Sequence, residues 1–309
     1  MYTPAISEGI SEKIRNKAYP CLTSLALCLE DSINDDSLEA AEIQLVKTLI
    51  DIKTSVPKED RPLLFVRIRT PEHMLAVHNM IRDSEDVLTG YILPKFDLDN
   101  AKRYIEVLTH INNHRMHKLY IMPTLESGMV ADAENRIDAL TKLKDVLAPI
   151  RNSILNIRVG GNDFSNLFGV RRKIHQTIYD IGVIRDILSD IINVFSREYV
   201  ISGPVWEYFG NSPDGAWAAG LKREISLDIV NGFTGKTAIH PSQLPVIYES
   251  LKVSKEDYND AQSILAWNRR GYAVAKSAGG TRMNEVKCHT RWAEKISCMG
   301  QIYGITEEA

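Results

Sequence analysis

The feature that most constrains the fold of this chain is a regular alternation of short apolar runs with longer stretches of helical periodicity. The runs are continuously apolar, which is typical of parallel strands buried on both faces. They cover residues 22–29, 63–68, 91–93, 119–122, 154–159, 199–201 and 237–239. With an eighth strand proposed at residues 1–3, these segments predict one parallel sheet.

Helices are predicted between these strands, at residues 35–50, 71–82, 97–112, 131–147, 174–195 and 214–230. Repeated strand–helix alternation requires right-handed crossovers, and a length of 309 residues suits one large barrel. We therefore predict a (β/α)8 TIM barrel. A doubly wound sheet is the alternative, but no glycine-rich dinucleotide-binding turn follows the first long strand.

The pattern changes after residue 241. A long surface helix is predicted at residues 254–276, a flexible break at 278–281 and a final helical arm at 283–296. We therefore expect a barrel catalytic domain at residues 1–250 and a C-terminal helical extension at residues 251–309. This arm has little of the barrel to pack on, which favours a homo-oligomer.

Charge and composition exclude several classes of protein. The formal net charge of −3 gives no reason to expect nucleic acid as a partner. No apolar run approaches the length of a membrane span, and the four cysteines lack the spacing of a zinc or redox site. The first 17 residues lack the apolar core of a secretion signal. We expect a soluble, cytoplasmic protein that binds neither nucleic acid nor membrane.

Charged residues stand where the predicted strands end, and barrel enzymes carry their chemistry at these carboxyl ends. Glu126 and Asp163 are the pair that best fits Mg2+, which is commonly held by one or two carboxylates together with water and substrate oxygens. The alternative is that each carboxylate caps the helix that follows it. Lys95, at the end of another strand, is a candidate substrate-binding residue.

Arg67 lies in a strand of large apolar residues, where a cation is costly unless it meets an anion. That anion is either a bound substrate or a fixed carboxylate, with Glu30 and Asp31 as the structural candidates. Strand alternation places Arg69 on the same side as Arg67, so both could point inward. One of the two acids can face the barrel mouth while the other caps the following helix.

The turn that contains Gly161 and Asn162 could form a backbone nest for an anion, with Arg171 and Arg172 nearby. Short glycine-rich turns are common, and adjacent basic residues more often face solvent. His240 stands at the end of the last predicted strand. It is either a substrate-binding residue or a turn histidine bonded to its own backbone.

Six segments together carry a family resemblance. They are Cys28-Leu29-Glu30-Asp31-Ser32-Ile33, Val66-Arg67-Ile68-Arg69, Leu93-Pro94-Lys95, Leu125-Glu126-Ser127-Gly128, Gly160-Gly161-Asn162-Asp163-Phe164 and the sequence GFTGKTAIHP at 232–241. In this order they resemble the citrate lyase beta-subunit group of the HpcH/HpaI aldolase superfamily, Mg2+-dependent carbon–carbon lyases built on a barrel. The match covers most of the chain, and the last motif is highly specific.

The resemblance implies roles for individual residues. Glu126 and Asp163 would bind Mg2+, Arg67 would hold the substrate's carboxylate or carbonyl oxygen, and Glu30 and Asp31 would order water at the metal. The implied reaction is a reversible aldol or Claisen-type cleavage of a small oxo- or hydroxy-acid or its acyl thioester. In this family the metal stabilises the enolate that develops as the bond breaks.

The chain departs from the family pattern at several places, two of which concern acidic site residues. The motif I-D-G-P is present as Ile201-Ser202-Gly203-Pro204 and lacks its acid. In coenzyme A-dependent relatives a C-terminal acid completes a neighbouring subunit's site. Glu285 stands at the corresponding place here, but the residues around it match the family motif less closely. Glu285 is therefore a candidate catalytic residue, and the use of coenzyme A stays open. The chain is similar to a divergent branch encoded beside tellurium-resistance-type stress genes, and the resemblance implies trimers or hexamers.

Two other functions remain as alternatives. One is phosphoryl or carboxyl transfer on a phosphoenolpyruvate-like substrate, in which Arg171, Arg172 and the glycine turn would hold phosphate. The other is a non-catalytic ligand-binding relative that keeps the barrel, to which the loss of the acid at Ser202 gives some support.

Overall fold

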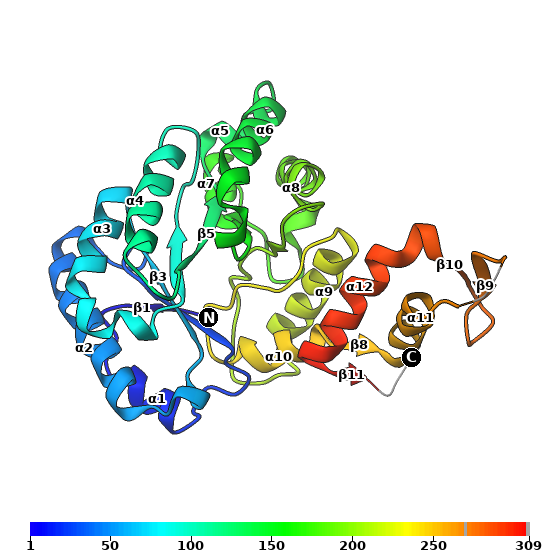
Figure 1. Ribbon diagram of the computed structural model, residues 1–309, viewed down its shortest axis with the longest axis horizontal. Coiled ribbons are helices and arrows are strands. Elements are labelled where there is room, and N and C mark those ends of the chain that lie inside the picture. Colours follow the sequence, from blue (N-terminus) through cyan, green and yellow to red (C-terminus); the bar gives the residue numbers. More distant parts are fainter. Residues whose placement is uncertain (269–270, 307–309) are drawn as a thin grey trace. The chain divides into compact units, whose positions relative to one another are not determined.

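The structure is a computed structural model that describes residues 1–268 and 271–306 (Figure 1). The chain divides into two compact units, Met1–Val246 and Ile247–Ala309. Each unit is described by itself below.

Seven parallel strands of the first unit form one curved sheet, in the order of the sequence (Figure 1). They are β1 (Tyr2–Pro4), β2 (Ser24–Cys28), β3 (Leu63–Arg67), β4 (Gly90–Leu93), β5 (Tyr120–Leu125), β6 (Ile157–Val159) and β7 (Ile201–Ser202). Every neighbouring pair of strands is parallel. The predicted parallel sheet is confirmed, including the strand proposed at the first residues.

The strand predicted at residues 237–239 is not a regular strand in the described part of the chain. Instead, Lys236 forms a parallel bridge with Gly203, just beyond β7, and the carbonyl oxygen of Ala238 accepts a hydrogen bond of 2.8 Å from the Tyr2 amide. Gly235 has a φ of +82°, so the chain enters this segment from a turn. The segment lies between the first and last strands and takes the eighth position of the barrel.

Helices follow the strands and lie on the outer side of the sheet (Figure 1). They are α1 (Ile10–Arg15), α2 (Leu38–Ser55), α3 (Pro71–Met80), α4 (Ala101–Asn113), α5 (Gly128–Ala131), α6 (Arg136–Leu147), α7 (Gly161–Leu167), α8 (Gly182–Phe195) and α9 (Ala216–Val230). The boundary between the two units falls within α10 (Gln243–Ser250). Short 3-10 helices are η1 (Asp35–Ser37), η2 (Lys58–Asp60), η3 (Arg82–Val87), η4 (Ala148–Ser153) and η5 (Ile178–Asp180).

The helix predicted over residues 174–195 begins later than expected. Its regular part is α8, whose apolar stripe of Ile184, Ile187, Leu188, Ile191 and Phe195 is buried. The residues before it form η5, whose start is fixed by a capping box: the Thr177 amide donates to Asp180 Oδ2 at 2.7 Å. This local hydrogen bond competes with continuous helix.

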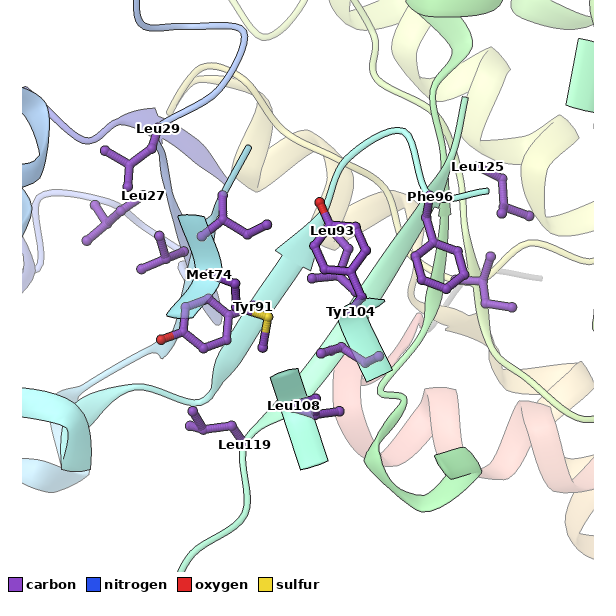
Figure 2. Packing of buried hydrophobic residues seen from close by; sticks show 14 of the residues in the cluster. Leu27, Leu29, Met74, Tyr91, Leu93, Phe96, Tyr104, Leu108, Leu119 and Leu125 are labelled. Atoms are coloured by element: carbon purple, nitrogen blue, oxygen red, sulfur yellow. The ribbon is translucent and has the colours of Figure 1, made fainter. Parts of the chain in front are cut away.

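The outward faces of the strands pack against the helices and form the main core. Figure 2 shows Tyr91 and Leu93 of β4 together with Met74 of α3 and Tyr104 of α4, all of them buried. Because successive side chains of a strand alternate, the neighbouring residues of each strand point into the barrel instead.

The inward face is apolar near the start of the strands and polar near their ends. Ala26, Phe65, Ile92 and Met122 form a separate buried cluster, against which Tyr2 packs. Two residues further along their strands, Cys28, Arg67 and Thr124 face the same interior. The change from apolar to polar places the site at the carboxyl ends of the strands.

The second unit contains β8 (Val253–Ser254), α11 (Lys255–Leu265), β9 (Val274–Lys276), β10 (Met283–Glu285), α12 (Val286–Tyr303) and β11 (Ile305–Thr306). Strands β9 and β10 are antiparallel, and β11 pairs with β8 in parallel. Its small core joins Ala261 and Ile264 of α11 to Ala293 of α12. Among the described residues, no helix is both long and apolar enough to cross a membrane.

The prediction of one helix over residues 254–276 was wrong at its end. Helix α11 stops at Leu265, and Gly271 has a φ of +82°, which right-handed helix does not allow. Residues 269–270 lie outside the described part of the chain. The break predicted at 278–281 is the tight turn between β9 and β10, closed by a hydrogen bond of 2.8 Å from the Ser277 amide to the Arg282 carbonyl oxygen.

Candidate active site

A cavity of about 360 Å3 lies at the carboxyl ends of the strands. Its walls come from β1, β2, β3, β5 and β6, from the first turn of α7 and from segment 237–239. Of the residues predicted for the site, Asp31, Arg67, Glu126, Gly161, Asn162 and Asp163 line it. The volume is near the lower end of the range of about 300–1,000 Å3 for small-molecule sites. The cavity therefore suits a small substrate.

Arg67 is the centre of an ionic cluster in this cavity. Its Nη2 atom lies 2.9 Å from Glu30 Oε2, 3.1 Å from Asp31 Oδ2 and 3.1 Å from Glu126 Oε1. The fixed carboxylates that the sequence suggested as partners of Arg67 are therefore present. A bound substrate remains possible as a second partner, because Arg67 also lines the cavity. The buried Nε atom of Arg67 has no hydrogen-bond partner among the described residues, which leaves a donor for a bound molecule.

Lys95 acts on the cluster through both its backbone and its side chain. It has a φ of +47°, a conformation that costs a residue other than glycine of order 1 kcal/mol and that is typical of functional sites. In this conformation its amide donates to Glu126 Oε1 at 2.9 Å. Its Nζ atom pairs with Glu30 and, at 3.3 Å, with Asp31. Lys95 does not line the cavity itself.

Glu126 and Asp163 meet across Gly160. A β-carbon placed on Gly160 would stand 2.3 Å from Glu126 Oε2 and 2.9 Å from Asp163 Oδ2, so only glycine leaves room for the two carboxylates. Whereas Glu126 Oε1 accepts from Arg67 and Lys95, Oε2 accepts no hydrogen bond within the described residues. This oxygen and Asp163 form the pair that the sequence predicted.

Neither carboxylate caps the helix that follows it through a hydrogen bond. Helix α5 follows Ser127 and helix α7 follows Gly160, and neither N-terminus receives a hydrogen bond from a capping side chain. Glu126 points to Arg67 instead, and Asp163 lies within the first turn of α7 and faces the cavity.

The electrostatics of the cluster favour a divalent cation. Glu30, Asp31, Glu126 and Asp163 outnumber Arg67 and Lys95 by two charges when every carboxyl is ionised. Burial raises the pKa of Glu126 to about 7, and Asp163 acts in the same direction against the effect of Arg67. Without a cation, Glu126 therefore tends to hold a proton near neutral pH.

The pKa values of Glu30 and Asp31, the two acids that follow β2, shift in opposite directions. Burial raises the pKa of Glu30. Burial also opposes the ionisation of Asp31, but the hydrogen bond with Glu30 and the charges of Arg67 and Lys95 lower the pKa of Asp31 overall. The two acids can therefore share one proton.

The donor set fits Mg2+. Among the described residues, no group of three or more histidine, cysteine or acidic side chains is arranged to hold a metal. The site instead offers two carboxylates beside a cavity, and Mg2+ is commonly bound by one or two carboxylates, with water and substrate oxygens as its other ligands.

Two residues that the sequence suggested for the site, His240 and Glu285, are not among the residues that line the cavity. The ring of His240 is stacked on Phe209, with centroids 4.3 Å apart, and its Nδ1 atom bonds Ser242 Oγ at 2.8 Å, whereas the adjacent Ile239 lines the cavity. This is the geometry of the turn histidine. Glu285 ends β10 in the second unit, where its amide donates to His289 Nδ1 at 3.0 Å. Its catalytic role stays a prediction.

The arginines expected beside the cavity also differ from the prediction. Strand β3 ends at Arg67, so alternation no longer governs Arg69, whose guanidinium binds the carbonyl oxygens of Leu29 and Ile33 at 2.8 and 2.6 Å. Arg171 is exposed and pairs with Glu207. Arg172 is buried and donates to a carbonyl oxygen, and neither Arg171 nor Arg172 lines the cavity.

A charged residue of the cavity lining was missed in the sequence. Arg158 stands in the middle of the apolar run that becomes β6, and it lines the cavity opposite Thr124 in the sheet register. Its guanidinium donates to Thr237 Oγ1 and lies over the ring of Tyr2, 5.1 Å from the centroid. The signal was available, because a lone cation in an apolar strand was the argument that identified Arg67.

The closing motif of the sequence, residues 232–241, supplies a second ionic cluster outside the cavity. Lys236 Nζ bonds Glu224 Oε1 at 2.7 Å and Asp228 Oδ2 at 2.8 Å, and all three side chains are almost completely buried. Asp228 Oδ1 accepts from the Tyr179 hydroxyl at 2.7 Å, and Glu224 Oε2 accepts from the Ile178 amide at 2.8 Å. All four carboxylate oxygens are thus satisfied by the protein.

Comparison with known proteins gives concordant matches. A family model described as C-C_Bond_Lyase of the TIM-Barrel fold matches residues 1–305. The human mitochondrial citramalyl-CoA lyase is 22% identical over 284 residues, which is 90% of this chain and 77% of that protein.

Two solved structures share the fold. The protein CitE from Mycobacterium tuberculosis, in complex with magnesium, acetoacetate and coenzyme A, has a TM-score of 0.63 and 20% identity, and the match covers 97% of this chain and 96% of that one. A citrate lyase from Burkholderia xenovorans LB400 has a TM-score of 0.72 and 14% identity, with 99% and 92% covered.

Proposed function

Because this chain belongs to the C–C bond lyase family of the TIM-barrel fold, we propose that it is a Mg2+-dependent carbon–carbon lyase. Its substrate would be a small oxo- or hydroxy-acid, either free or as an acyl thioester. The observation that carries this proposal is the meeting of Glu126 and Asp163 across Gly160, beside Arg67 in the cavity. The magnesium in the related CitE structure supports the choice of metal.

Glu126 and Asp163 would hold the ion through oxygens that face each other across Gly160. When bound, Mg2+ would supply Lewis-acid stabilisation of the negative charge that develops on a substrate oxygen as the carbon–carbon bond breaks. The Lys95 amide holds Glu126 through Oε1, which leaves Oε2, without a hydrogen bond from the described residues, beside Gly160 for the ion.

Arg67 would bind the carboxylate or carbonyl oxygen of the substrate. Glu30 and Asp31 hold its guanidinium at Nη2, so its position is fixed before substrate arrives. Its partnerless Nε atom is the donor that a substrate oxygen would take. Glu30 and Asp31 would also retain water in the mouth of the cavity, and the raised pKa of Glu30 makes it a candidate for proton transfer.

Gly161 and Asn162 remain proposed substrate-binding residues, and Glu285 remains a proposed catalytic residue. Lys95 and His240 stay predictions for substrate binding, although neither lines the cavity. Gly161 and Asn162 line the cavity. We propose that the protein is a homo-oligomer and that Glu285 completes the site of a neighbouring copy.

The coenzyme A in the CitE structure supports a thioester as one form of the substrate. The arginines suggested for phosphate do not line the cavity, and no other observation favours phosphoryl transfer.

The test is a product analysis by NMR. The purified protein is incubated, with and without Mg2+, with four- to six-carbon oxo- and hydroxy-acids and their coenzyme A thioesters. We expect cleavage of at least one compound that needs Mg2+ and is lost in Asp163→Asn but not in Arg171→Gln, the control outside the cavity. Tight binding of these compounds without any turnover would show a non-catalytic relative and overturn the proposal.

A further inference from the structure

The cavity contains two arginines in opposite electrostatic situations. Arg67 lies within 3.1 Å of three carboxylates. Arg158 has no carboxylate at salt-bridge distance among the described residues, although it lines the same cavity. The positive charge of Arg67 is therefore already balanced by carboxylates of the protein, whereas that of Arg158 is not.

The guanidinium of Arg158 is held in place by neutral groups. It donates to Thr237 Oγ1, its Nη1 atom is 3.9 Å from Met122 Sδ, and it stacks over Tyr2. A thioether is a weak acceptor, so within the described residues most of the five N–H donors of the side chain are left to bind another molecule. The group is oriented but not neutralised.

Tyr2 connects the two arginines without balancing their charge. Its ring centroid is 5.6 Å from the guanidinium carbon of Arg67 and 5.1 Å from that of Arg158. Burial raises the pKa of the Tyr2 hydroxyl, so the ring is neutral at physiological pH. Two cations thus flank one aromatic side chain, and only the Arg67 side carries carboxylates.

A half-buried cation without an anion is unfavourable, and a carboxylate is the group that a planar guanidinium recognises best. We propose that Arg158 binds a second carboxylate of the substrate, remote from the oxygens that face Glu126 and Asp163. The site would then select dicarboxylate oxo- or hydroxy-acids over monocarboxylates. The assignment of the reacting end rests on the proposed lyase function, but binding at Arg158 is measured without turnover.

The experiment compares two ligands of equal length by calorimetry in the presence of Mg2+. Oxaloacetate and 2-oxobutyrate share the same 2-oxo acid end and differ in a distal carboxylate in place of a methyl group. We expect the wild-type protein to bind oxaloacetate at least about tenfold more tightly, the effect of one charged hydrogen-bonded pair. Equal affinity for both ligands, or no binding of either, would overturn the proposal.

Two variants assign the preference to this side chain. Arg158→Gln should weaken oxaloacetate binding by at least about tenfold and 2-oxobutyrate binding by less than about threefold, which removes the preference. Arg158→Lys keeps the positive charge but lacks the planar guanidinium, so it should retain part of the preference for oxaloacetate. Arg171→Gln, an exposed arginine outside the cavity, should behave as wild type. A preference that persists in both Arg158 variants contradicts the proposal.

Mg2+ binding and the preference for oxaloacetate together distinguish an error in the Arg158 assignment from an error in the lyase proposal. If Mg2+ does not bind while the oxaloacetate preference exists and is lost in Arg158→Gln, the metal-dependent lyase is wrong and the anion site stands. If Mg2+ binds and carbon–carbon cleavage occurs while Arg158→Gln leaves the preference unchanged, the lyase stands and the Arg158 assignment is wrong.

Discussion

The two ionic clusters of the barrel use similar residues and end in opposite states. Around Lys236, two carboxylates receive a hydrogen bond on every oxygen, and no cluster member lines the main cavity. Around Arg67, Glu126 Oε2 receives none within the described residues, and carboxylates exceed cations. A closed, satisfied cluster stabilises the fold, whereas an open one with excess negative charge is prepared for a ligand.

Each cluster also has a glycine pressed against a carboxylate. A β-carbon on Gly160 would stand 2.3 Å from Glu126 Oε2, and one on Gly203 would stand 2.5 Å from Asp228 Oδ2. The same packing device therefore serves a binding site in one place and the closure of the barrel in the other. This parallel allows matched experiments on the two clusters.

The largest expected effect is on stability, at the closed cluster. Lys236→Met leaves the buried carboxylate of Asp228 without its cation and leaves Glu224 with only Arg172, 3.7 Å away, which should cost about 3–5 kcal/mol of unfolding free energy. Chemical denaturation measures this loss. A change below about 1 kcal/mol would contradict the structural role of the cluster.

The open cluster should respond in the opposite way. Glu126→Gln should lower the affinity for Mg2+ by more than about 100-fold, since even outer partners of a metal site contribute 10–100-fold. The metal-free variant should be no less stable than wild type at pH 8, because a neutral amide replaces a buried charge. Calorimetry gives the affinity and thermal melts give the stability. If Glu126→Gln lost stability but bound Mg2+ as wild type does, the cluster around Arg67 would be structural rather than metal-binding.

The two glycines test the comparison with one kind of substitution. Gly160→Ala should lower Mg2+ affinity by about tenfold and also reduce stability, because the added β-carbon would stand 2.3 Å from Oε2 of Glu126 and 2.3 Å from its Cβ, which is fixed to the backbone. Gly203→Ala should cost about 1–3 kcal/mol of stability, because Asp228 is fixed on all sides. Equal behaviour of the two variants in both assays would show that the clusters are not functionally distinct.

The smallest expected effect is on the pH dependence of stability. Since the pKa of Glu126 is raised in the folded protein to about 7, its contribution to stability is fully present below pH 4.5 and is lost as the pH rises through 7. The stability of metal-free wild type, measured relative to Glu126→Gln, should therefore fall between these pH values. A difference between the two proteins that stays constant with pH would show that Glu126 titrates normally.

The sequence predicted the barrel because its signals are local and repeated. Apolar runs and strand-end motifs located the strands and placed Glu126, Asp163, Arg67 and Asp31 at one cavity. The missed features depend on distant partners. The direction of Arg69 follows from where β3 ends, and the role of Lys236 depends on two acids of α9.

Local backbone chemistry explains the remaining errors. Gly271 and the turn at Ser277 interrupt a stretch whose composition favours helix, and the Thr177–Asp180 capping box delays the start of α8. Arg158 was overlooked because the apolar character of its run decided the interpretation. Asking which anion meets each lone strand cation would have identified it, as it did for Arg67.

The claim that Glu126 and Asp163 form the metal site is tested most directly by diffraction from crystals grown with Mn2+ as a substitute for Mg2+. The account predicts one anomalous peak beside Gly160, between the two carboxylates, with Glu126 Oε2 as a ligand. A peak at a different place, or none at saturating Mn2+, would contradict it.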